Sequence, residues 1–349
     1  MVKRALLVTL LALVAAGATA QIVKADGLGM MMRASQGVTV NGSPDRYVAI
    51  SPNTTPKLTV VERINQSDGR VGRWWYLRGH YYVPAVAYDR SGGGLSADGR
   101  TLVLTRFTRA FPPRSTRFAI LDTDLYLRHP RRAGQRRPRH AITYVDLRGE
   151  FSFDAISPDG STIYLIHHYL SPRAGAAYLS NYEVRAFDLK SRRLLPEPIV
   201  DPKEPDERMA GVPITRAMSP DGRWAYTLYD GNGKAPFLHA LDTIAHRAVC
   251  VDLPQLKDRR NLFLLRMRVE DGGGELGVLS RTAGLGRSRP LLNIDTQTFA
   301  VHDPAPVAAA SSAITPWLAI GLAALAAALA LAWKLKTRWT AERPPLEQA

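Results

Sequence analysis

Two oppositely charged side chains occupy the same place in two similar segments of the sequence. Asp154 begins Asp-Ala-Ile-Ser-Pro, and Arg216 begins Arg-Ala-Met-Ser-Pro. A carboxylate and a guanidinium brought together by the fold could recognise a polar ligand through charge-assisted hydrogen bonds. They could also pair with each other and stiffen the fold. The sequence therefore predicts Asp154 and Arg216 as candidate ligand-binding residues and leaves both uses open.

A second concentration of charge is a run of arginines between two apolar segments. The chain has a formal net charge of +15, which favours anionic partners such as lipid headgroups or acidic polymers. The run has no aromatic residue on which bases could stack, so we do not expect nucleic acid as a partner. The alternative is a solvated loop. The predicted anionic-surface patch consists of Arg128, Arg131, Arg132, Arg136, Arg137 and Arg139.

The familiar catalytic and cofactor patterns are incomplete in this sequence. No Gly-x-Ser-x-Gly segment is present, and Asp230-Gly-Asn-Gly-Lys lacks the spacing of a phosphate loop and is typical of a turn. Asp122-Thr-Asp is too short for a calcium loop. His167 and His168 stand in an expected loop and would point apart on an extended chain. We therefore expect no catalytic residue, no metal site and no cofactor.

Asp154 and Arg216 precede two copies of a turn that the sequence contains three times. Each copy has Ser-Ala-Asp-Gly or Ser-Pro-Asp-Gly between apolar segments, and Gly99, Gly160 and Gly222 are 61 and 62 residues apart. Pro fixes φ, Asp bonds the local backbone and Gly accepts a positive φ, so each copy predicts a tight turn between strands. Repetition at this spacing indicates one structural unit used several times.

Further repeats extend the array in both directions. Ala49-Ile-Ser-Pro-Asn is a weaker copy of the turn, and Glu270–Val278 is a decayed copy of ambiguous register. Apolar strands that end in Asp recur between the turns, so each unit offers four strands. We predict an all-β fold, a β-propeller of about five blades of four antiparallel strands, over residues 37–302. Extra surface loops are expected at 106–117, 128–140, 167–181 and 196–211.

The repeated turn resembles that of the bacterial β-propellers with Ser-Pro-Asp-Gly repeats, which include TolB-like and YVTN-type repeat proteins. The resemblance covers roughly residues 37–302. It implies that the strand before each turn is the innermost of its blade, which would put Asp154 and Arg216 at the mouth of a central channel. Members bind proteins, sugars or small ligands and some are enzymes, so the resemblance implies no single activity.

The first 36 residues have the layout of an export signal and a short extension. Lys3 and Arg4 precede an apolar run that ends in Ala18-Thr-Ala, which predicts a secretory signal peptide over residues 1–20. An uncleaved membrane anchor is the alternative. Residues 21–36 would form an N-terminal extension.

The last part of the chain has the composition of a membrane anchor. Residues 303–312 are expected to form a Pro/Ala/Ser stalk, and residues 313–333 are uncharged and long enough for one transmembrane helix. Lys334 and Lys336 follow immediately, so the positive-inside rule predicts a cytoplasmic tail over residues 334–349. This topology makes the protein a single-pass protein of the cell membrane with its N-terminal domain outside.

Together these features predict a membrane-anchored, extracytoplasmic β-propeller that acts as a non-catalytic binding or scaffolding module at the cell envelope. Its expected partners are the cytoplasmic membrane, through residues 313–333, and an envelope protein or anionic polymer. The alternative is an anchored propeller enzyme, a lyase or hydrolase that acts on an envelope sugar or lactone at the channel mouth. A role in assembling an envelope complex is a third possibility.

Overall fold

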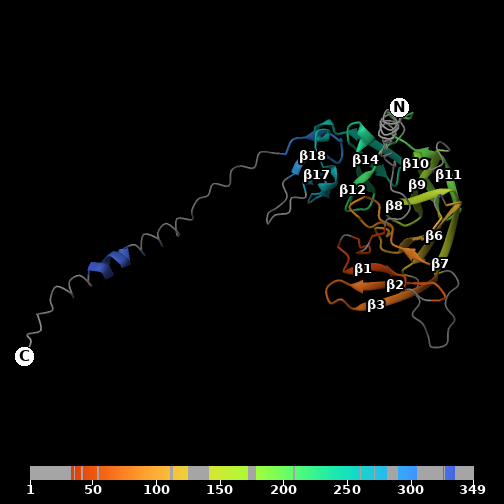
Figure 1. Ribbon diagram of the computed structural model, residues 1–349, viewed down its shortest axis with the longest axis horizontal. Helices are drawn as coiled ribbons and strands as arrows, with labels where there is room; N and C mark the ends of the chain where they lie inside the picture. Colours follow the sequence, from red (N-terminus) through yellow and green to blue (C-terminus); the bar gives the residue numbers. More distant parts are fainter. Residues whose placement is uncertain are drawn as a thin grey trace, which may run out of the picture. The chain divides into compact units, whose positions relative to one another are not determined.

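The regular secondary structure of the described residues is almost entirely antiparallel strand (Figure 1). A computed structural model describes residues 33–34, 36–40, 42–52, 55–110, 113–124, 141–171, 178–206, 209–259, 261–270, 272–280, 290–304, 325 and 327–334. These residues form five sheets, in each of which the strands are paired in chain order. Figure 1 shows the sheets following one another in an arc.

The first two sheets cover residues 45–148. The first contains β1 (Asp45–Ile50), β2 (Leu58–Asn65) and β3 (Val71–Arg78). The second contains β4 (Tyr81–Tyr82), β5 (Thr101–Arg106), β6 (Ser115–Asp122) and β7 (Ile142–Arg148).

The other three sheets have four strands each. The third contains β8 (Glu150–Ile156), β9 (Thr162–Ser171), β10 (Tyr178–Asp188) and β11 (Arg193–Ile199). The fourth contains β12 (Pro213–Met218), β13 (Trp224–Tyr229), β14 (Phe237–Asp242) and β15 (Arg247–Asp252). The fifth contains β16 (Leu265–Val269), β17 (Glu275–Ser280), β18 (Pro290–Asp295) and β19 (Val301–His302). The prediction of an all-β, propeller-like fold with about five antiparallel sheets is confirmed.

Short 3₁₀ turns complete the secondary structure of this domain. They are η2 (Gly231–Gly233), η3 (Pro254–Leu256) and η4 (Leu262–Leu264). The first lies between β13 and β14, in the Gly-rich segment that the sequence predicts to be a turn.

The repeated turns have one geometry. In each, the serine Oγ donates to the aspartate Oδ1, at 2.6, 2.7 and 2.5 Å in chain order. The same Oδ1 accepts the backbone N–H two residues later, at 3.0 Å in all three. The glycines have φ of 70°, 71° and 74°, the left-handed region that favours glycine. Each turn therefore satisfies its own polar groups and reverses the chain between the first and second strands of a sheet.

The decayed fifth copy adopts the same turn, which fixes its register. Gly273 has φ of 78°, and its N–H donates to Glu270 O at 2.9 Å, as Gly222 N donates to Ser219 O at 2.9 Å. Thr296 Oγ1 donates to Gly273 O at 2.7 Å, and Thr243 Oγ1 donates to Gly222 O at 3.3 Å. Glu270 therefore stands in the place of the turn serine.

The weak copy predicted at Ala49–Asn53 does not lie at the first turn of the first sheet. Val38 pairs with Tyr47 through two backbone hydrogen bonds, so the chain around Val38 adds a short segment to the edge of β1. Ser43-Pro-Asp connects that segment to β1, and Asp45 N donates to Ser43 Oγ at 3.1 Å. Ser51-Pro lies one connection later, between β1 and β2. The first sheet thus has its own Ser-Pro-Asp turn, without the glycine.

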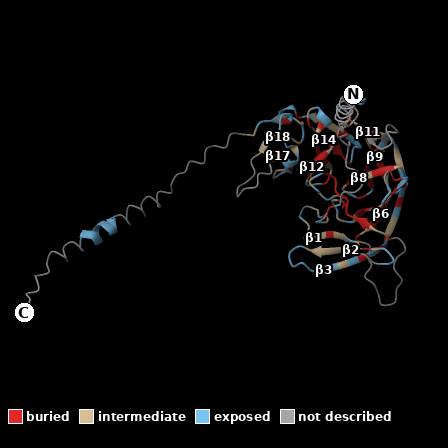
Figure 2. Ribbon diagram, viewed as in Figure 1, coloured by how far each residue is buried: buried red, intermediate tan, exposed pale blue. Residues whose placement is uncertain are grey.

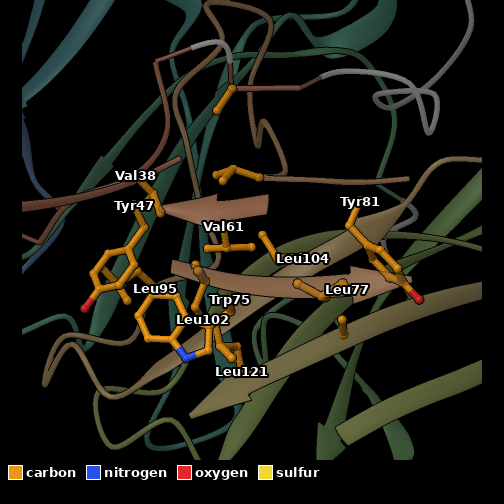
Figure 3. Packing of buried hydrophobic residues seen from close by; sticks show 13 residues of the cluster. Val38, Tyr47, Val61, Trp75, Leu77, Tyr81, Leu95, Leu102, Leu104 and Leu121 are labelled. Carbon is orange, nitrogen blue, oxygen red and sulfur yellow. The ribbon is translucent and has the colours of Figure 1, made fainter. Parts of the chain in front are cut away.

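Consecutive sheets pack face to face and enclose apolar clusters. Figure 3 shows the cluster between the first and second sheets, in which the Tyr47 and Trp75 rings lie side by side with centroids 6.2 Å apart. Phe118 of β6 and Phe153 of β8 belong to the cluster between the second and third sheets. Leu238 and Val278 belong to the cluster between the fourth and fifth. Figure 2 shows the buried residues in red, gathered on the strands that face a neighbouring sheet.

One of the four expected loops is largely strand, and a second begins inside a strand. β9 and β10 occupy most of residues 167–181, so His167 and His168 lie in β9 and not in a loop. β11 extends to Ile199, inside the expected loop 196–211. The strands of the third sheet are longer than the repeat length indicates.

The chain divides by its internal contacts into two compact units, residues 1–303 and 304–349. In the second unit, residues 325 and 327–334 are helical. Within the described residues no helix is both long and apolar enough to span a bilayer. Most of the predicted span at 313–333 lies outside the described residues, as does the predicted signal peptide.

Two equivalent turn glycines should differ in their tolerance of a methyl group. A Cβ on Gly160 would lie 2.2 Å from Thr101 Oγ1 of the preceding sheet, whereas a Cβ on Gly99 would meet no atom within 4 Å. Gly99→Ala should cost about 1 kcal/mol for the left-handed backbone alone. Gly160→Ala should cost about 1–3 kcal/mol more because it crowds the neighbouring sheet. Urea unfolding of both variants measures the difference, and equal losses would contradict the packing of the Gly160 turn against the second sheet.

Candidate ligand-binding site

Asp154 and Arg216 meet across two sheets and form a buried ion pair. Asp154 lies on β8 and Arg216 on β12, the first strands of the third and fourth sheets, and their side chains are 3% and 5% exposed. Arg216 Nη2 donates to Asp154 Oδ1, and Arg216 Nη1 donates to Asp154 O at 2.9 Å. Of the two uses that the sequence leaves open, mutual pairing is present in the structure. Binding of a ligand by these residues stays a prediction.

The ion pair leaves one nitrogen of Arg216 without a hydrogen-bond partner among the described residues. Both Nη atoms bond to Asp154, but Arg216 Nε is buried without a hydrogen-bond partner among the described residues. A buried donor without an acceptor costs about 1–3 kcal/mol, and more on a charged group. The Arg216 side chain therefore retains the capacity to bind one further acceptor.

A loop that the repeat pattern does not predict is attached to β12, the strand that carries Arg216. Residues 83–93, here the central loop, interrupt the first strand of the second sheet between β4 and Leu95. Tyr88 N donates to Pro213 O at 2.8 Å and Asp89 N to Ile214 O at 3.1 Å, which attaches the loop tip to β12. Gly93, which takes the place equivalent to Asp154, has no room for a side chain because a Cβ would lie 2.6 Å from Val86 Cγ1.

Asp89 anchors the central loop to two sheets. Its side chain is 4% exposed and forms an ion pair with Arg266 Nη1 on β16. Asp89 Oδ2 accepts a hydrogen bond from Thr215 Oγ1 of β12 at 2.7 Å. Asp89 Oδ1 accepts from Ser91 N at 2.9 Å and from Ser91 Oγ at 2.5 Å. Both carboxylate oxygens are thus occupied, and the second, fourth and fifth sheets are linked at one point.

These groups surround a pocket of about 710 Å³, here called the central pocket. That volume lies within the range of small-molecule sites. Residues of four sheets contribute, because the segment before β1 supplies Gln36 and the other walls come from the central loop, β12 and the chain around β16. The charged and aromatic side chains that line the central pocket are Tyr88, Asp89, Arg90, Arg216, Phe263 and Arg266.

The central pocket has an aromatic side. Tyr88 and Phe263 are 52% and 42% exposed, and their ring centroids are 4.5 Å apart with planes tilted by 56°. Large exposed aromatic side chains next to a concavity are common at binding sites. The arrangement offers both an apolar surface and guanidinium donors to one ligand.

Sequence reasoning missed Asp89, Arg266 and the aromatic pair. Asp-Arg-Ser-Gly at residues 89–92 has turn composition, which could have predicted a hairpin inside the first strand. The long-range ion pair between Asp89 and Arg266 has no local signal. The predicted arginine patch of residues 128–139 lies outside the described residues.

The two adjacent histidines lie on opposite faces of β9. His167 stacks on Phe151, with centroids 4.2 Å apart, whereas His168 Nε2 and Ser152 Oγ are 2.8 Å apart. Burial, followed by the nearby His167, lowers the pKa of His168 to about 4. Burial likewise lowers the pKa of His239, which lies on β14, to about 4. The described residues contain no group of three or more side chains placed to hold a metal ion.

Comparison with known proteins yields similar structures but no family. No protein-family model and no curated protein sequence matches the chain. Similar solved structures include TolB from Acinetobacter baumannii, with 16% identity, 74% of this chain and 52% of that chain covered, and a TM-score of 0.36. The chain therefore spans about half of that TolB structure.

Two further structures are similar over comparable lengths. The β-propeller domain of Myceliophteria thermophila Cps50 (Swd1) has 13% identity, with 75% of this chain and 72% of that chain covered, at a TM-score of 0.36. Pyrococcus horikoshii acylaminoacyl peptidase has 7% identity, with 76% and 38% covered, at a TM-score of 0.39. The assignment of a propeller-like fold rests on the five sheets themselves.

The Asp154–Arg216 pair should show strong thermodynamic coupling. Asp154→Asn and Arg216→Gln should each reduce the free energy of unfolding by about 3 kcal/mol, because each leaves a buried partner uncompensated. In the double variant the loss of unfolding free energy should be smaller than the sum of the two single-variant losses by at least about 1 kcal/mol. The exposed Arg268–Glu270 pair is the control, where coupling should stay below about 0.5 kcal/mol. Coupling no larger than in the control would contradict a buried pair.

The buried histidines should make stability fall on the acid side. The folded-state pKa values of His168 and His239 are lowered to about 4 from the 6.5 of an ordinary histidine. The unfolded chain therefore binds more protons between these values, and stability is complete above pH 6.5 and lost as the pH falls toward 4. Each histidine should contribute a loss of about 2 kcal/mol between pH 7 and pH 5. Urea titrations at both pH values measure it, and His239→Gln should reduce the difference; an unchanged difference would contradict burial of a neutral His239.

Proposed function

We propose that the protein is an envelope binding module that takes a ligand, or a group on a larger partner, in the central pocket. The observation that carries the proposal is the buried Arg216 Nε, which lacks a partner among the described residues, on a side chain that lines the pocket. A ligand that supplies an acceptor removes the cost of that unused donor.

The state of the carboxylates supports binding over catalysis. A general acid or base must reach the proton that it transfers with a free oxygen. Asp89 uses both oxygens to bind Thr215, Ser91 and Arg266, and Asp154 is buried against Arg216. These two carboxylates serve to hold the guanidinium groups in place, which is the task of a recognition site.

The location in the proposal rests on the composition of the two ends. Residues 1–20 have the layout of an export signal, and the uncharged residues 313–333 are followed by Lys334 and Lys336. The proposed module is therefore displayed outside the cytoplasmic membrane, anchored by residues 313–333. Its ligand is then part of the envelope, either a protein or an anionic polymer.

A cysteine reporter at the pocket tests both parts of this proposal. Gln36 is exposed and lines the central pocket, and Ser67 is an exposed residue of the β2–β3 turn. Gln36→Cys and Ser67→Cys are made in a Cys250→Ser background, because Cys250 is the only cysteine of the chain. Spheroplasts and purified protein are then labelled with a membrane-impermeant maleimide, and the labelling rates are compared.

We expect both cysteines to react in intact spheroplasts, which places the domain outside. The labelling rate of Gln36→Cys is divided by that of Ser67→Cys in each preparation. This ratio should be several-fold lower in spheroplasts than in the purified chain, because the envelope ligand covers the pocket. Labelling of both cysteines only after lysis would overturn the location. Equal relative rates in spheroplasts and purified protein would overturn occupation of the central pocket.

A further inference from the structure

The walls of the central pocket carry a small excess of positive charge. Arg90, Arg216 and Arg266 line it, and the carboxylates that touch these guanidiniums are those of Asp89 and Asp154. Three cations and two anions leave one unit of positive charge. A ligand with a single negative charge neutralises this excess, whereas a dianion would leave an uncompensated charge next to Asp89.

Two of the guanidiniums are held in place before a ligand arrives. Arg216 is fixed by Asp154 on β8, and Arg266 is fixed by Asp89 at the tip of the central loop. Ordering an arginine side chain normally costs rotamer entropy on binding, and a donor that is already ordered avoids that cost. Arg216 Nε is the donor that remains buried and unused among the described residues.

The third guanidinium is differently placed. Arg90 is exposed at the turn of the central loop, with φ of 66°, and its side chain forms no ion pair with the described part of the chain. It therefore carries the excess charge and can approach an anion without losing another contact. Planar guanidinium groups suit carboxylates, whose two oxygens match their parallel N–H bonds.

The aromatic side of the pocket favours a particular kind of chemical group next to the anionic group of the ligand. Tyr88 is adjacent in sequence to Asp89, and its ring contacts that of Phe263 close to Arg266. A flat or apolar group next to the anion would cover these two half-exposed rings while the anion reaches the arginines. Burying aromatic surface in this way contributes to binding without regard to charge.

On the basis of the proposed function, we propose that the central pocket recognises a monoanionic carboxylate attached to a flat or apolar group. The carboxylate accepts hydrogen bonds from Arg216 Nε and from the free N–H groups of Arg90 and Arg266. The attached group packs against Tyr88 and Phe263. Acidic side chains or termini of an envelope protein and acidic units of a polymer both supply a carboxylate, and the group next to it would have to cover Tyr88 and Phe263.

Simple probes test the charge requirement on the purified full-length chain. Benzoate has a carboxylate on a flat ring, benzamide is its neutral counterpart, phenyl phosphate carries more negative charge, and acetate lacks the ring. Calorimetric titration should rank benzoate first. Benzamide should bind at least about tenfold more weakly, because it loses a charge-assisted hydrogen bond. Phenyl phosphate and acetate should both bind more weakly than benzoate.

Two variants connect the binding to the named residues without removing a structural ion pair. Arg90→Gln should weaken benzoate several-fold and leave benzamide unchanged, because Arg90 is exposed and makes no ion pair with the described residues. Phe263→Ala should weaken benzoate and benzamide by the same factor, because it removes apolar contact only. Thermal unfolding of both variants checks that the fold is intact.

The outcomes separate this inference from the proposed function. Equal affinity for benzoate and benzamide, or an effect of Arg90→Gln on both alike, overturns the carboxylate assignment while the pocket remains a binding site. Tighter binding of phenyl phosphate than of benzoate assigns the pocket to phosphate groups and overturns the inference. Failure of benzoate to bind also overturns it, and the labelling of Gln36→Cys then decides whether the pocket is occupied at all. Competition experiments distinguish the two sources of the carboxylate. If the partner is a protein, a synthetic acidic peptide should compete with benzoate. If the partner is a polymer, an acidic oligosaccharide should compete with benzoate.

Discussion

The attachment of the repeated turn to the third strand of its own sheet, present in the second, fourth and fifth sheets, is the constraint on which the rest of the domain depends. Thr123, Thr243 and Thr296 each donate from Oγ1 to the carbonyl of the turn glycine, at 2.5, 3.3 and 2.7 Å. The Ser-x-Asp-Gly turn and the Asp-Thr strand end, which the sequence shows as separate repeats, are therefore two halves of one contact. That contact connects the turn before the second strand to the end of the third strand in these three sheets. Asp154 and Arg216 stand six residues before the glycines of two turns, on the first strands β8 and β12, and meet there although Asp154 lies at a register shift of β8 and Arg216 pairs with Thr227.

The centre of the domain is held by charge as well as by apolar packing. Asp154 links β8 to β12, and Asp89 links the central loop to β12 and β16. Each carboxylate orients a guanidinium, and both oxygens of Asp89 are occupied by Thr215, Ser91 and Arg266. Buried ion pairs contribute little net stability because desolvation of both ions offsets their attraction. Their value here lies in holding donors rigidly at a pocket, which suits recognition.

The repeats made the sheet count and the positions of the turns predictable. They also predicted that Asp154 and Arg216 are equivalent, although not which of their two uses the fold would adopt. The central loop could not be predicted, because it occurs in one sheet only and its anchor, Asp89 with Arg266, joins residues 177 positions apart in the sequence. The first turn was misassigned because Ser51-Pro-Asn matches the repeat by composition, whereas Ser43-Pro-Asp lacks the glycine. Only the pairing of Val38 with Tyr47 distinguishes the two.

Arg216 Nε is buried without a hydrogen-bond partner among the described residues, and it is the donor that the proposed ligand of the central pocket engages. The most direct measurement is the ¹H–¹⁵N spectrum of the arginine Nε–H groups in the full-length chain, with the Arg216 resonance assigned from an Arg216→Lys variant. On addition of benzoate, the Arg216 Nε–H resonance should shift downfield and exchange more slowly with water. The Nε–H of Arg117, which donates to Asp146 Oδ1 at 2.6 Å on an exposed surface, should stay unchanged. An Arg216 resonance that does not move while benzoate binds would contradict the account.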